Sequence, residues 1–346
     1  MEDTLFKELL DAYDYPLPKE RIGFVPREPR DSAKLLVYDP STAGTSETTF
    51  ACLADILPPH ALLVFNNTKV LPARIYAKKK TGGVVEILCT TLNLPDNTCV
   101  AKANKKLAEG DILTTDHGTL TVQSATGDYI FKAAPSLATI LERSGTTPIP
   151  PYLKHTPLPE AVLKERYQTI FAKELGSIAA PTASLHFTDS LFSALHERGI
   201  ETVETTLHVN LGTFAPLTEE AIESGRLHEE RYEISEAAAA IINTAKDTGR
   251  PIIAVGTTAL RTLESAAANG RVLPGTATTR LFIREGFTFQ ICDGLITNFH
   301  VPRSSLMMLV AALIGRERLL ALYVEAAARD FKFLSFGDGM LILPKK

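Results

Sequence analysis

The sequence predicts an α/β fold: an α/β barrel-like main domain with an inserted small all-β barrel domain. Helical and strand patterns alternate after Ser177, which is typical of a core built on parallel strands. From Ala73 to Lys132 the periodicity is instead almost purely strand-like, with glycine turns between the segments. We therefore expect residues 1–72 and 155–346 to form one discontinuous domain, and residues 73–154 to form the inserted barrel.

In the first half of the chain, the apolar runs LLVY and LLVF at residues 35–38 and 62–65 predict two buried strands. Several short strands with regular glycine turns then suggest a small barrel. We expect these strands at residues 84–88, 112–113, 119–122 and 129–132. A helical pattern at residues 136–143 and a proline-rich return at residues 148–159 follow them.

In the second half, polar caps and glycine stops delimit the helices. Thr188 is a fair N-cap for a helix that ends near Gly199, and Ser235 caps a helix that Gly249 stops. Strands are expected at residues 201–209 and 251–255, with a helix from about residue 258 to 268. Two further helical patterns, at residues 304–314 and 316–329, close the chain.

Length and composition are ordinary for a globular protein. The 346 residues can bury one large core or two smaller ones, and 45% of them are apolar and 22% charged. The four cysteines lack metal-ligand spacing, so we expect buried thiols in a reducing compartment. The first residues lack the basic region of a signal peptide, and the longest apolar run, residues 306–314, is too short to span a bilayer. We predict a cytoplasmic protein without membrane contact.

Positive charge gathers in the predicted insert. Residues 74–154 contain ten Lys and Arg against seven Asp and Glu, so this segment carries +3 and the rest of the chain −7 of the net −4. A basic face on an acidic protein suits docking of a phosphate backbone. The alternative is solubilising charge on strand edges, which also favour lysine.

Two segments combine polar groups with small and apolar residues, GSIAAPTASLHFT at residues 176–188 and DGLITNFHVP at residues 293–302. Both look too irregular to be a plain core helix or strand. Small residues let a backbone approach a ligand closely, and His and Thr supply hydrogen-bond groups. Each segment leads into a helical pattern, and a helix N-terminus favours an anionic or electron-rich ligand. The alternative is a pair of hydrogen-bonded loops under an apolar lid.

Standard catalytic signatures are missing. The chain has no G-x-G-x-x-G after a strand, no P-loop, no H-E-x-x-H and no G-x-S-x-G, so no glycine fingerprint supports an adenosine-binding Rossmann methyltransferase. In open α/β folds the ligand binds beyond the carboxyl ends of the strands. We expect the loops that follow strands at Phe65, Val209, Val255 and Ile291 to converge there.

The polar motifs, taken in order, closely resemble the S-adenosylmethionine:tRNA ribosyltransferase-isomerase family of the queuosine pathway. The resemblance covers almost the whole chain, and so many motifs in the same order are highly specific. They include YDYPLP at 13–18, PRD at 29–31, YQT at 167–169, AAPT at 179–182, LHF at 185–187, HVNLGTF at 208–214, GTT at 256–258, RTLE at 261–264, residues 293–300 and FGD at 336–338.

This resemblance implies an activity and its substrates. Members of that family move the ribosyl part of S-adenosylmethionine onto a 7-aminomethyl-7-deazaguanine base at the tRNA wobble position, form epoxyqueuosine and release adenine and methionine. It therefore implies S-adenosylmethionine as co-substrate and tRNA with a deazaguanine wobble base as partner, with no obligate protein partner. Such a reaction calls for a general base, a donor to adenine and a water-poor pocket.

Eight residues are our candidates for this site. We expect His186, His208, Asp293 and His300 to form its polar centre, because His and carboxylates are the natural acid and base groups. Thr182, Thr258 and Asn298 are expected to hydrogen-bond the co-substrate or the base. Arg261 is expected to contact a carboxylate or a phosphate, unless it simply pairs with Glu264 one turn on. The alternative for each is a structural hydrogen bond at a loop. No cluster has metal-ligand spacing, so we expect no metal.

Two departures from the family pattern bear on function. Asn67 and Ser184 stand where Asp and Gly are usual. They are the support for a rival hypothesis, a tRNA-binding accessory protein that has lost catalysis; binding without adenine release would favour it. A second rival is a small-molecule α/β enzyme such as a sugar isomerase, in which the basic barrel is only solubilising surface. Salt-insensitive behaviour toward tRNA would favour that enzyme, although the full-length resemblance argues against it.

Overall fold

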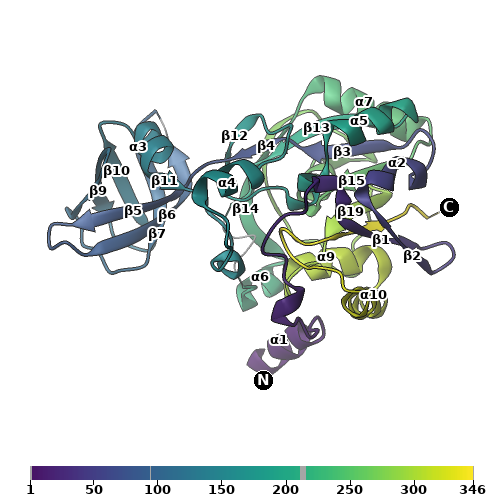
Figure 1. Ribbon diagram of the computed structural model, residues 1–346, viewed down its shortest axis with the longest axis horizontal. Coiled ribbons are helices and arrows are strands. Elements are labelled where there is room, and N and C mark those ends of the chain that lie inside the picture. The colour runs from purple at the N-terminus through teal and green to yellow at the C-terminus, as the bar shows by residue number, and fades with distance from the viewer. Residues whose placement is uncertain (1, 94, 211–215, 346) are drawn as a thin grey trace.

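A nine-stranded mixed sheet forms the centre of the larger part of the chain (Figure 1). The computed structural model describes residues 2–93, 95–210 and 216–345. The four central strands β13, β3, β15 and β19 run parallel, so their carboxyl ends meet at one edge. The order across the sheet is β18 (Gly275–Leu281), β14 (Arg226–Ile234), β13 (Glu201–Leu207), β3 (Leu62–Asn66), β15 (Ile252–Val255), β19 (Gly294–Asn298), β20 (Gly339–Ile342), β1 (Lys34–Asp39) and β2 (Gly44–Thr49).

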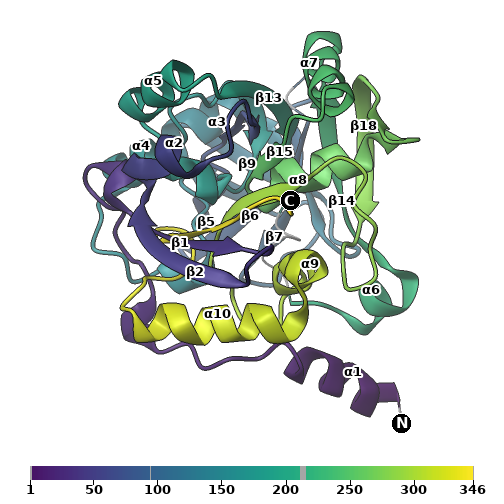
Figure 2. The ribbon, with the colours of Figure 1, turned by 90° about the vertical axis from the view of Figure 1, so that its right-hand side faces the viewer.

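Helices cover both faces of this sheet, because alternate residues of its buried strands point to opposite sides. In β3, Leu62 and Val64 belong to one apolar cluster and Leu63 and Phe65 to the other. The first cluster is closed by helices α7 to α10, and the second by α2 and α5. Figure 2 shows α10 on one side of β1 and β2, with α2 and α5 on the other.

The helices begin where polar caps were expected. Thr188 and Ser235 accept N–H bonds from Leu191 and Ala238, and so cap α5 and α7. The longer helices are α1 (Glu2–Asp11), α5 (Asp189–Glu197), α7 (Glu236–Asp247), α8 (Thr257–Ser265), α9 (Ser305–Ile314) and α10 (Arg316–Ala328). Short elements are η1 (Lys19–Arg21), η2 (Arg30–Ser32), η3 (Phe50–Cys52), α2 (Leu53–Ile56), α6 (Glu219–Ser224), β16 (Ala267–Ala268) and β17 (Arg271–Val272).

The smaller part is an antiparallel barrel with its own apolar core. Six strands close on themselves because β5 pairs with both β6 and β8. Helix α3 (Leu137–Ser144) contributes three buried side chains to that core. The sheet order is β11 (Gly145–Thr146), β5 (Arg74–Lys79), β6 (Val84–Asn93), β7 (Thr98–Ala103), β10 (Tyr129–Ala134), β9 (Gly118–Ser124) and β8 (Ile112–Thr115).

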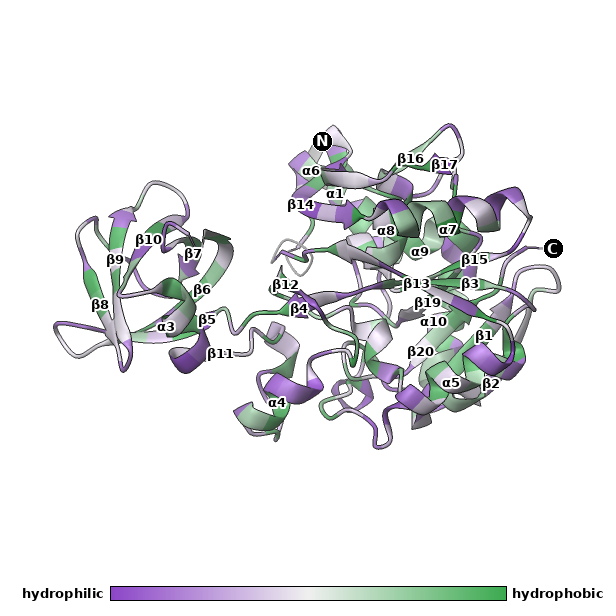
Figure 3. Ribbon diagram, turned by 90° about the horizontal axis from the view of Figure 1, so that it is seen from above, coloured by the Kyte–Doolittle hydropathy of each residue, from purple (hydrophilic) through white to green (hydrophobic). Residues whose placement is uncertain are grey.

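Short elements join the two parts (Figure 3). Strand β4 (Thr68–Val70) pairs with β12 (Glu174–Ser177), and η4 (Pro151–Leu153) and α4 (Glu160–Arg166) lead back from the barrel. The Gln168 side chain donates to the Val70 carbonyl at 2.8 Å and accepts the Val70 N–H at 3.0 Å. This two-point clamp fixes β4, which runs directly into the first strand of the barrel.

The predicted fold class, an α/β main part with an inserted β-barrel, is confirmed. The predicted strands at residues 35–38, 62–65 and 251–255 are β1, β3 and β15. One expectation was wrong: residues 293–302 are not an irregular segment throughout, because residues 294–298 form β19, a fully buried central strand. The antiparallel strands β14 and β18, which extend the sheet beyond β13, were not foreseen.

None of the helices in residues 2–93, 95–210 and 216–345 combines the length and the apolarity needed to cross a membrane. Within the same ranges, no three His, Cys, Asp or Glu side chains gather in a way that could hold a metal ion.

Candidate active site

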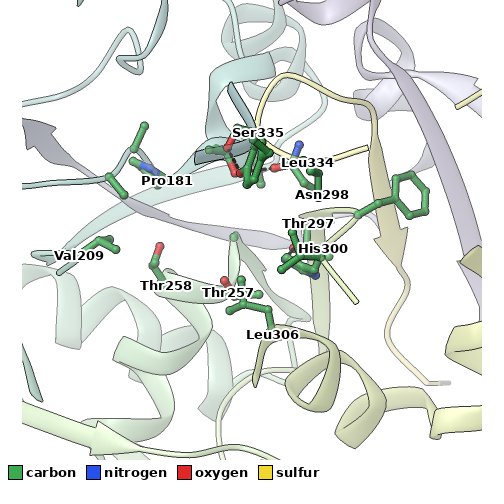
Figure 4. Close-up of a pocket in the computed structure, with 18 residues that line it drawn as sticks. Pro181, Val209, Thr257, Thr258, Thr297, Asn298, His300, Leu306, Leu334 and Ser335 are labelled. Carbon is green, nitrogen blue, oxygen red and sulfur yellow. Dashed lines mark hydrogen bonds between the residues drawn. The ribbon is translucent and has the colours of Figure 1, made fainter. Parts of the chain in front are cut away.

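A pocket lies at the carboxyl ends of the central parallel strands, where open α/β folds bind their ligands (Figure 4). The loops after β13, β15 and β19 converge on it, as expected for the loops at Val209 and Val255. We call it the main pocket. It is lined by Tyr152, Ala179, Ala180, Pro181, Thr182, Ala183, Val209, Gly256, Thr257, Thr258, Thr297, Asn298, Phe299, His300, Val301, Leu306, Leu334 and Ser335.

Asn298, the last residue of β19, connects the two polar segments that the sequence singled out. Its Oδ1 accepts a hydrogen bond from the Thr182 hydroxyl at 2.9 Å, and its Nδ2 lies 3.3 Å from Nε2 of His186. The His186 ring also stacks on Phe50, with 4.3 Å between ring centroids. Burial lowers the pKa of His186 to about 4, and the nearby positive charge of Arg30 acts in the same direction. His186 is therefore a neutral imidazole held against the pocket wall.

His300 lines the main pocket directly. Its Nε2 lies 3.2 Å from the Thr297 hydroxyl, and its Nδ1 lies 3.3 Å from the Tyr323 hydroxyl. Desolvation lowers the pKa of His300 to about 3, so the ring is uncharged near neutral pH. Both nitrogens of this neutral imidazole already have partners in the protein, one as donor and one as acceptor.

Thr258 stands at the N-terminal turn of α8, where β15 ends. Its hydroxyl accepts a hydrogen bond from Asn66 Nδ2 at 3.1 Å, and Asn66 also bonds the backbone N–H and carbonyl of Leu207. The ends of β3, β13 and β15 are thus tied together under the pocket. Gly256, just before α8, has φ of 92°, a conformation that glycine adopts without steric cost.

Arg261 and Glu230 form a buried ion pair one turn further along α8, with 5% and 2% exposure. They line a second pocket with Leu227, His228, Ile283, Ser305, Leu306 and Leu309, and Leu306 belongs to the main pocket as well. The alternative partner considered for Arg261, Glu264, is engaged elsewhere. Its carboxylate accepts the backbone N–H groups of Gln290, Ile291 and Cys292.

His208 lies beside the main pocket rather than in it. Its Nδ1 is 2.9 Å from the Thr68 hydroxyl, and Gly176 packs so closely on the ring that a Cβ there would come within 2.8 Å of Nδ1. Burial, aided by the charge of Arg231, lowers the pKa of His208. The rest of its motif, residues 211–214, lies outside the described residues.

The structure does not bring Asp293 to this site. Asp293 precedes β19, and its Oδ2 accepts the Ile252 N–H at 2.9 Å at the start of β15. The pocket lies at the other end of these parallel strands, roughly 15 Å away for a five-residue strand. The expectation of a catalytic Asp293 is therefore corrected: its carboxylate joins two strands at their amino ends. The Ile291 loop lies at that same end and does not converge on the pocket.

Known proteins share this architecture and sequence. The family model described as queuosine biosynthesis protein matches residues 10–342. The chain belongs to this family. An S-adenosylmethionine:tRNA ribosyltransferase-isomerase of Gloeobacter violaceus is 45% identical, covering 97% of this chain and 96% of its own, and one of Legionella pneumophila is 43% identical, covering 95% and 98%. The crystal structure of S-adenosylmethionine tRNA ribosyltransferase from Thermotoga maritima is 31% identical, with a TM-score of 0.54 over 96% of this chain and all of that chain.

Other residues of the main pocket in this family member were not singled out from sequence. The Tyr152 hydroxyl and the Ser335 hydroxyl are 2.6 Å apart, and burial raises the pKa of Tyr152 to about 12. Leu334 lines the pocket with φ of 71°, an uncommon backbone conformation for a branched side chain. Tyr152 lies within the proline-rich return, and Ser335 directly precedes the FGD motif. Neither motif indicated which of its side chains faces the pocket.

A third, smaller pocket adjoins His186 and is strongly basic. Arg27, Arg30 and Arg166 line it with His186, and Ser335 lies in both this pocket and the main one. Arg30 donates to the Gln168 carbonyl at 2.7 Å, while Arg166 pairs with Glu28. Arginines at this position can bind an anion beside the main pocket.

The two departures from the family pattern do not line the main pocket through their side chains. Asn67 donates to Glu204 at 3.1 Å and accepts from the Thr206 hydroxyl at 2.7 Å. An aspartate there would face the Glu204 carboxylate, so asparagine suits this chain. Ser184 is fully buried in η5 (Thr182–His186), and its hydroxyl has no hydrogen-bond partner among the described residues.

Proposed function

We propose that this chain is an S-adenosylmethionine:tRNA ribosyltransferase-isomerase. It moves the ribosyl moiety of S-adenosylmethionine onto 7-aminomethyl-7-deazaguanine at the tRNA wobble position, forms epoxyqueuosine and releases adenine and methionine. The single observation that carries this proposal is the match over nearly full length to enzymes of that name, at 42–45% identity. The apolar pocket at the strand ends, with few polar groups, is the kind of site such a reaction needs.

The polar groups of the main pocket match the demands of the chemistry. A proton must leave the carbon beside the sulfonium, and adenine must depart with a hydrogen bond to its ring. We assign hydrogen bonding to the substrate to Thr258 and Thr182, which line the pocket with a buried and a half-buried hydroxyl. We assign it also to the buried His300, where a ring nitrogen would exchange its protein partner for the substrate. His186 is a positioning residue in this scheme, acting through Asn298, and His208 supports the strand end beneath Val209.

His186 and His300 do not become positively charged near neutral pH, because their pKa values lie at about 4 and about 3. They are therefore suited to donating and accepting hydrogen bonds while uncharged. A neutral site also fits S-adenosylmethionine, because its sulfonium would be repelled by an imidazolium ion. The described residues contain no candidate metal cluster, and the proposed scheme uses none.

For tRNA we propose two contact regions. The arginine-lined pocket beside His186 would hold a phosphate next to the wobble base, which must leave its stack to enter the main pocket. Lysines of the barrel would contact the tRNA backbone further away. In this scheme residues 1–72 and 155–346 carry the catalytic domain and residues 73–154 the inserted tRNA-contacting domain. The proposed substrate places the protein in the cytoplasm.

Adenine release tests the proposal. Purified protein is mixed with S-adenosylmethionine and tRNA that carries the aminomethyl-deazaguanine base, and free adenine and the digested nucleosides are followed by mass. We expect adenine release that depends on the modified base, together with epoxyqueuosine. Binding of that tRNA without release of adenine would contradict the proposal and favour an accessory protein.

A further inference from the structure

The second pocket, built around Arg261 and Glu230, lies directly beside the main pocket. Leu306 belongs to both, and Figure 4 shows its side chain near Thr257 and His300 at the edge of the main pocket. Leu306 is therefore the side chain that stands between the main pocket and Arg261.

Arg261 has a donor that no described residue satisfies. Its Nη1 pairs with Glu230, and its Nε donates to the Leu281 carbonyl at 3.3 Å. Its Nη2 is buried and has no hydrogen-bond partner among the described residues. A buried, unpaired guanidinium N–H is costly, and native proteins rarely leave one without a ligand or water. Within the described part of the chain, one N–H of a fixed guanidinium is thus left available for an acceptor.

Helix α9 begins at the same pocket. Ser305, its first residue, and Leu306 line the pocket, while Ser304 caps the helix by accepting the Met307 N–H at 3.4 Å. The first N–H groups of a helix have no partner within the helix, and they carry partial positive charge. Arg261 and the start of this ten-residue helix therefore both favour a negative group.

The negative charge of Glu230 limits which kind of anion can bind in the second pocket. Its carboxylate pairs with Arg261 and accepts the Asn210 N–H at 3.1 Å. Beside this negative charge a phosphate dianion would be repelled. An α-amino acid is different, because it carries a carboxylate for Arg261 and an ammonium for Glu230 on adjacent atoms. The Glu230 carboxylate attracts an ammonium electrostatically, whatever other partners it keeps.

We infer that the Arg261–Glu230 pocket binds the methionine end of S-adenosylmethionine, with its carboxylate on Arg261 Nη2 and the start of α9, and its ammonium on Glu230. This inference rests on the proposed function. The sulfonium and ribosyl groups then pass Leu306, and adenine occupies the main pocket. The same pocket holds the methionine that the reaction releases.

Decarboxylated S-adenosylmethionine is the probe that isolates this contact, because it keeps the adenosine, the sulfonium and the amine but lacks the carboxylate. Binding of both compounds is measured by calorimetry without tRNA, on wild type, Arg261→Met and the charge-retaining Arg261→Lys. We expect wild type to bind S-adenosylmethionine about 10- to 100-fold more tightly than the probe, as charged hydrogen bonds of this kind contribute. In Arg261→Met this preference should disappear, and in Arg261→Lys it should be partly retained.

Arg271→Met is the matched control, because Arg271 forms an ion pair with Asp247 on the exposed surface. It should keep the wild-type preference. Thermal unfolding of each variant checks folding, and Arg261→Met/Glu230→Leu replaces the whole pair if the single variant does not fold. A preference unchanged in a folded Arg261 variant would overturn the inference, even if wild type releases adenine from modified tRNA. Tight S-adenosylmethionine binding with this preference, but without adenine release, would instead overturn only the proposed function.

Discussion

His186 and His300 are both uncharged in the folded protein, His300 in the lining of the main pocket and His186 in the small pocket beside it. Each ring is removed from water, and burial lowers the pKa of His186 to about 4 and of His300 to about 3, from an ordinary value of 6.5. In the unfolded chain both rings take up a proton as the pH falls below about 6.5. The unfolded state then binds more protons than the native state, so acid destabilises the fold.

The first prediction follows from this difference. The free energy of unfolding should be highest above pH 6.5 and should fall as the pH decreases toward about 4, where His186 titrates in the native state. Each such histidine contributes about 1.4 kcal/mol per pH unit in that window. Urea unfolding of His186→Gln, measured from pH 4.5 to 7, should show a slope smaller by about that amount. The exposed His155→Gln should keep the wild-type slope; an unchanged slope in His186→Gln would contradict the prediction.

The second prediction compares substitutions at the two ends of β19. Asp293→Asn should leave adenine release within about twofold of wild type, because asparagine can still accept the Ile252 N–H and the pocket is a strand length away. Asn298→Ala removes the bonds to Thr182 and His186, and should lower kcat by roughly 10- to 100-fold if each positioned bond contributes about 1 kcal/mol or more. Steady-state kinetics with modified tRNA compares the two variants directly. A large loss of kcat in a folded Asp293→Asn would restore a catalytic role for Asp293.

At the scale of elements, hydrophobic periodicity and caps predicted most of the structure. Thr188 and Ser235 cap helices as expected, because a polar N-cap followed by an apolar period is a local signal. Strand β19 was missed because its residues GLITN include two polar side chains. Thr297 bonds to His300 three residues on, whereas Asn298 is buried by hydrogen bonding to Thr182 and His186 of another segment. That tertiary pairing leaves no local signature.

Strand β19 also explains which site residues could be predicted from the sequence. Thr182, Thr258, Asn298 and His300 were identified from segments rich in polar and small residues, and they do line one pocket. Asp293 was misplaced because the direction of the chain through its segment was not known: once residues 294–298 are a strand, the two ends of the segment must lie apart. Tyr152 and Ser335 meet across 183 residues of sequence, a contact that no local pattern encodes.

The third prediction concerns the junction between β4 and the barrel. Gln168→Leu removes both hydrogen bonds to Val70 and should lower the free energy of unfolding by about 1–2 kcal/mol. Amide exchange should rise in residues 67–73 while residues 84–93 of β6 stay protected, because the barrel has its own core. Hydrogen exchange followed by mass spectrometry measures both segments. Gln123→Leu, at an exposed position in β9, should leave residues 67–73 unchanged. Equal exchange in both variants would show that the clamp does not fix β4.

For the whole molecule, the distribution of charge sets how tRNA can approach. Residues 74–154 carry a surplus of three positive charges on a chain whose net charge is −4, so phosphate is attracted at the barrel and repelled over much of the rest. In the barrel, the end of β5 lies beside the segment that contains Lys105 and Lys106. The Lys105 Nζ lies 3.8 Å from where a Cβ on Gly83 would stand, and Lys79 donates to the Lys106 carbonyl at 2.9 Å.

The fourth prediction is that these lysines contribute to tRNA affinity through phosphate contacts. The variant Lys78→Ala/Lys105→Ala removes Lys105 and its neighbour in the barrel Lys78, an exposed residue of β5. In this variant tRNA should bind more weakly, and the slope of log affinity against log salt should become less steep by about one for each lysine that contacts a phosphate. Affinity for S-adenosylmethionine should not change, because the main pocket lies at the ends of the central strands. Filter binding from 50 to 300 mM salt measures the slope. Lys7→Ala/Lys19→Ala removes two exposed lysines outside the barrel and should keep it. Identical slopes for the barrel variant and wild type would mean that the barrel lysines serve only to solubilise the strand edges, and that tRNA is held by the arginines beside the pocket.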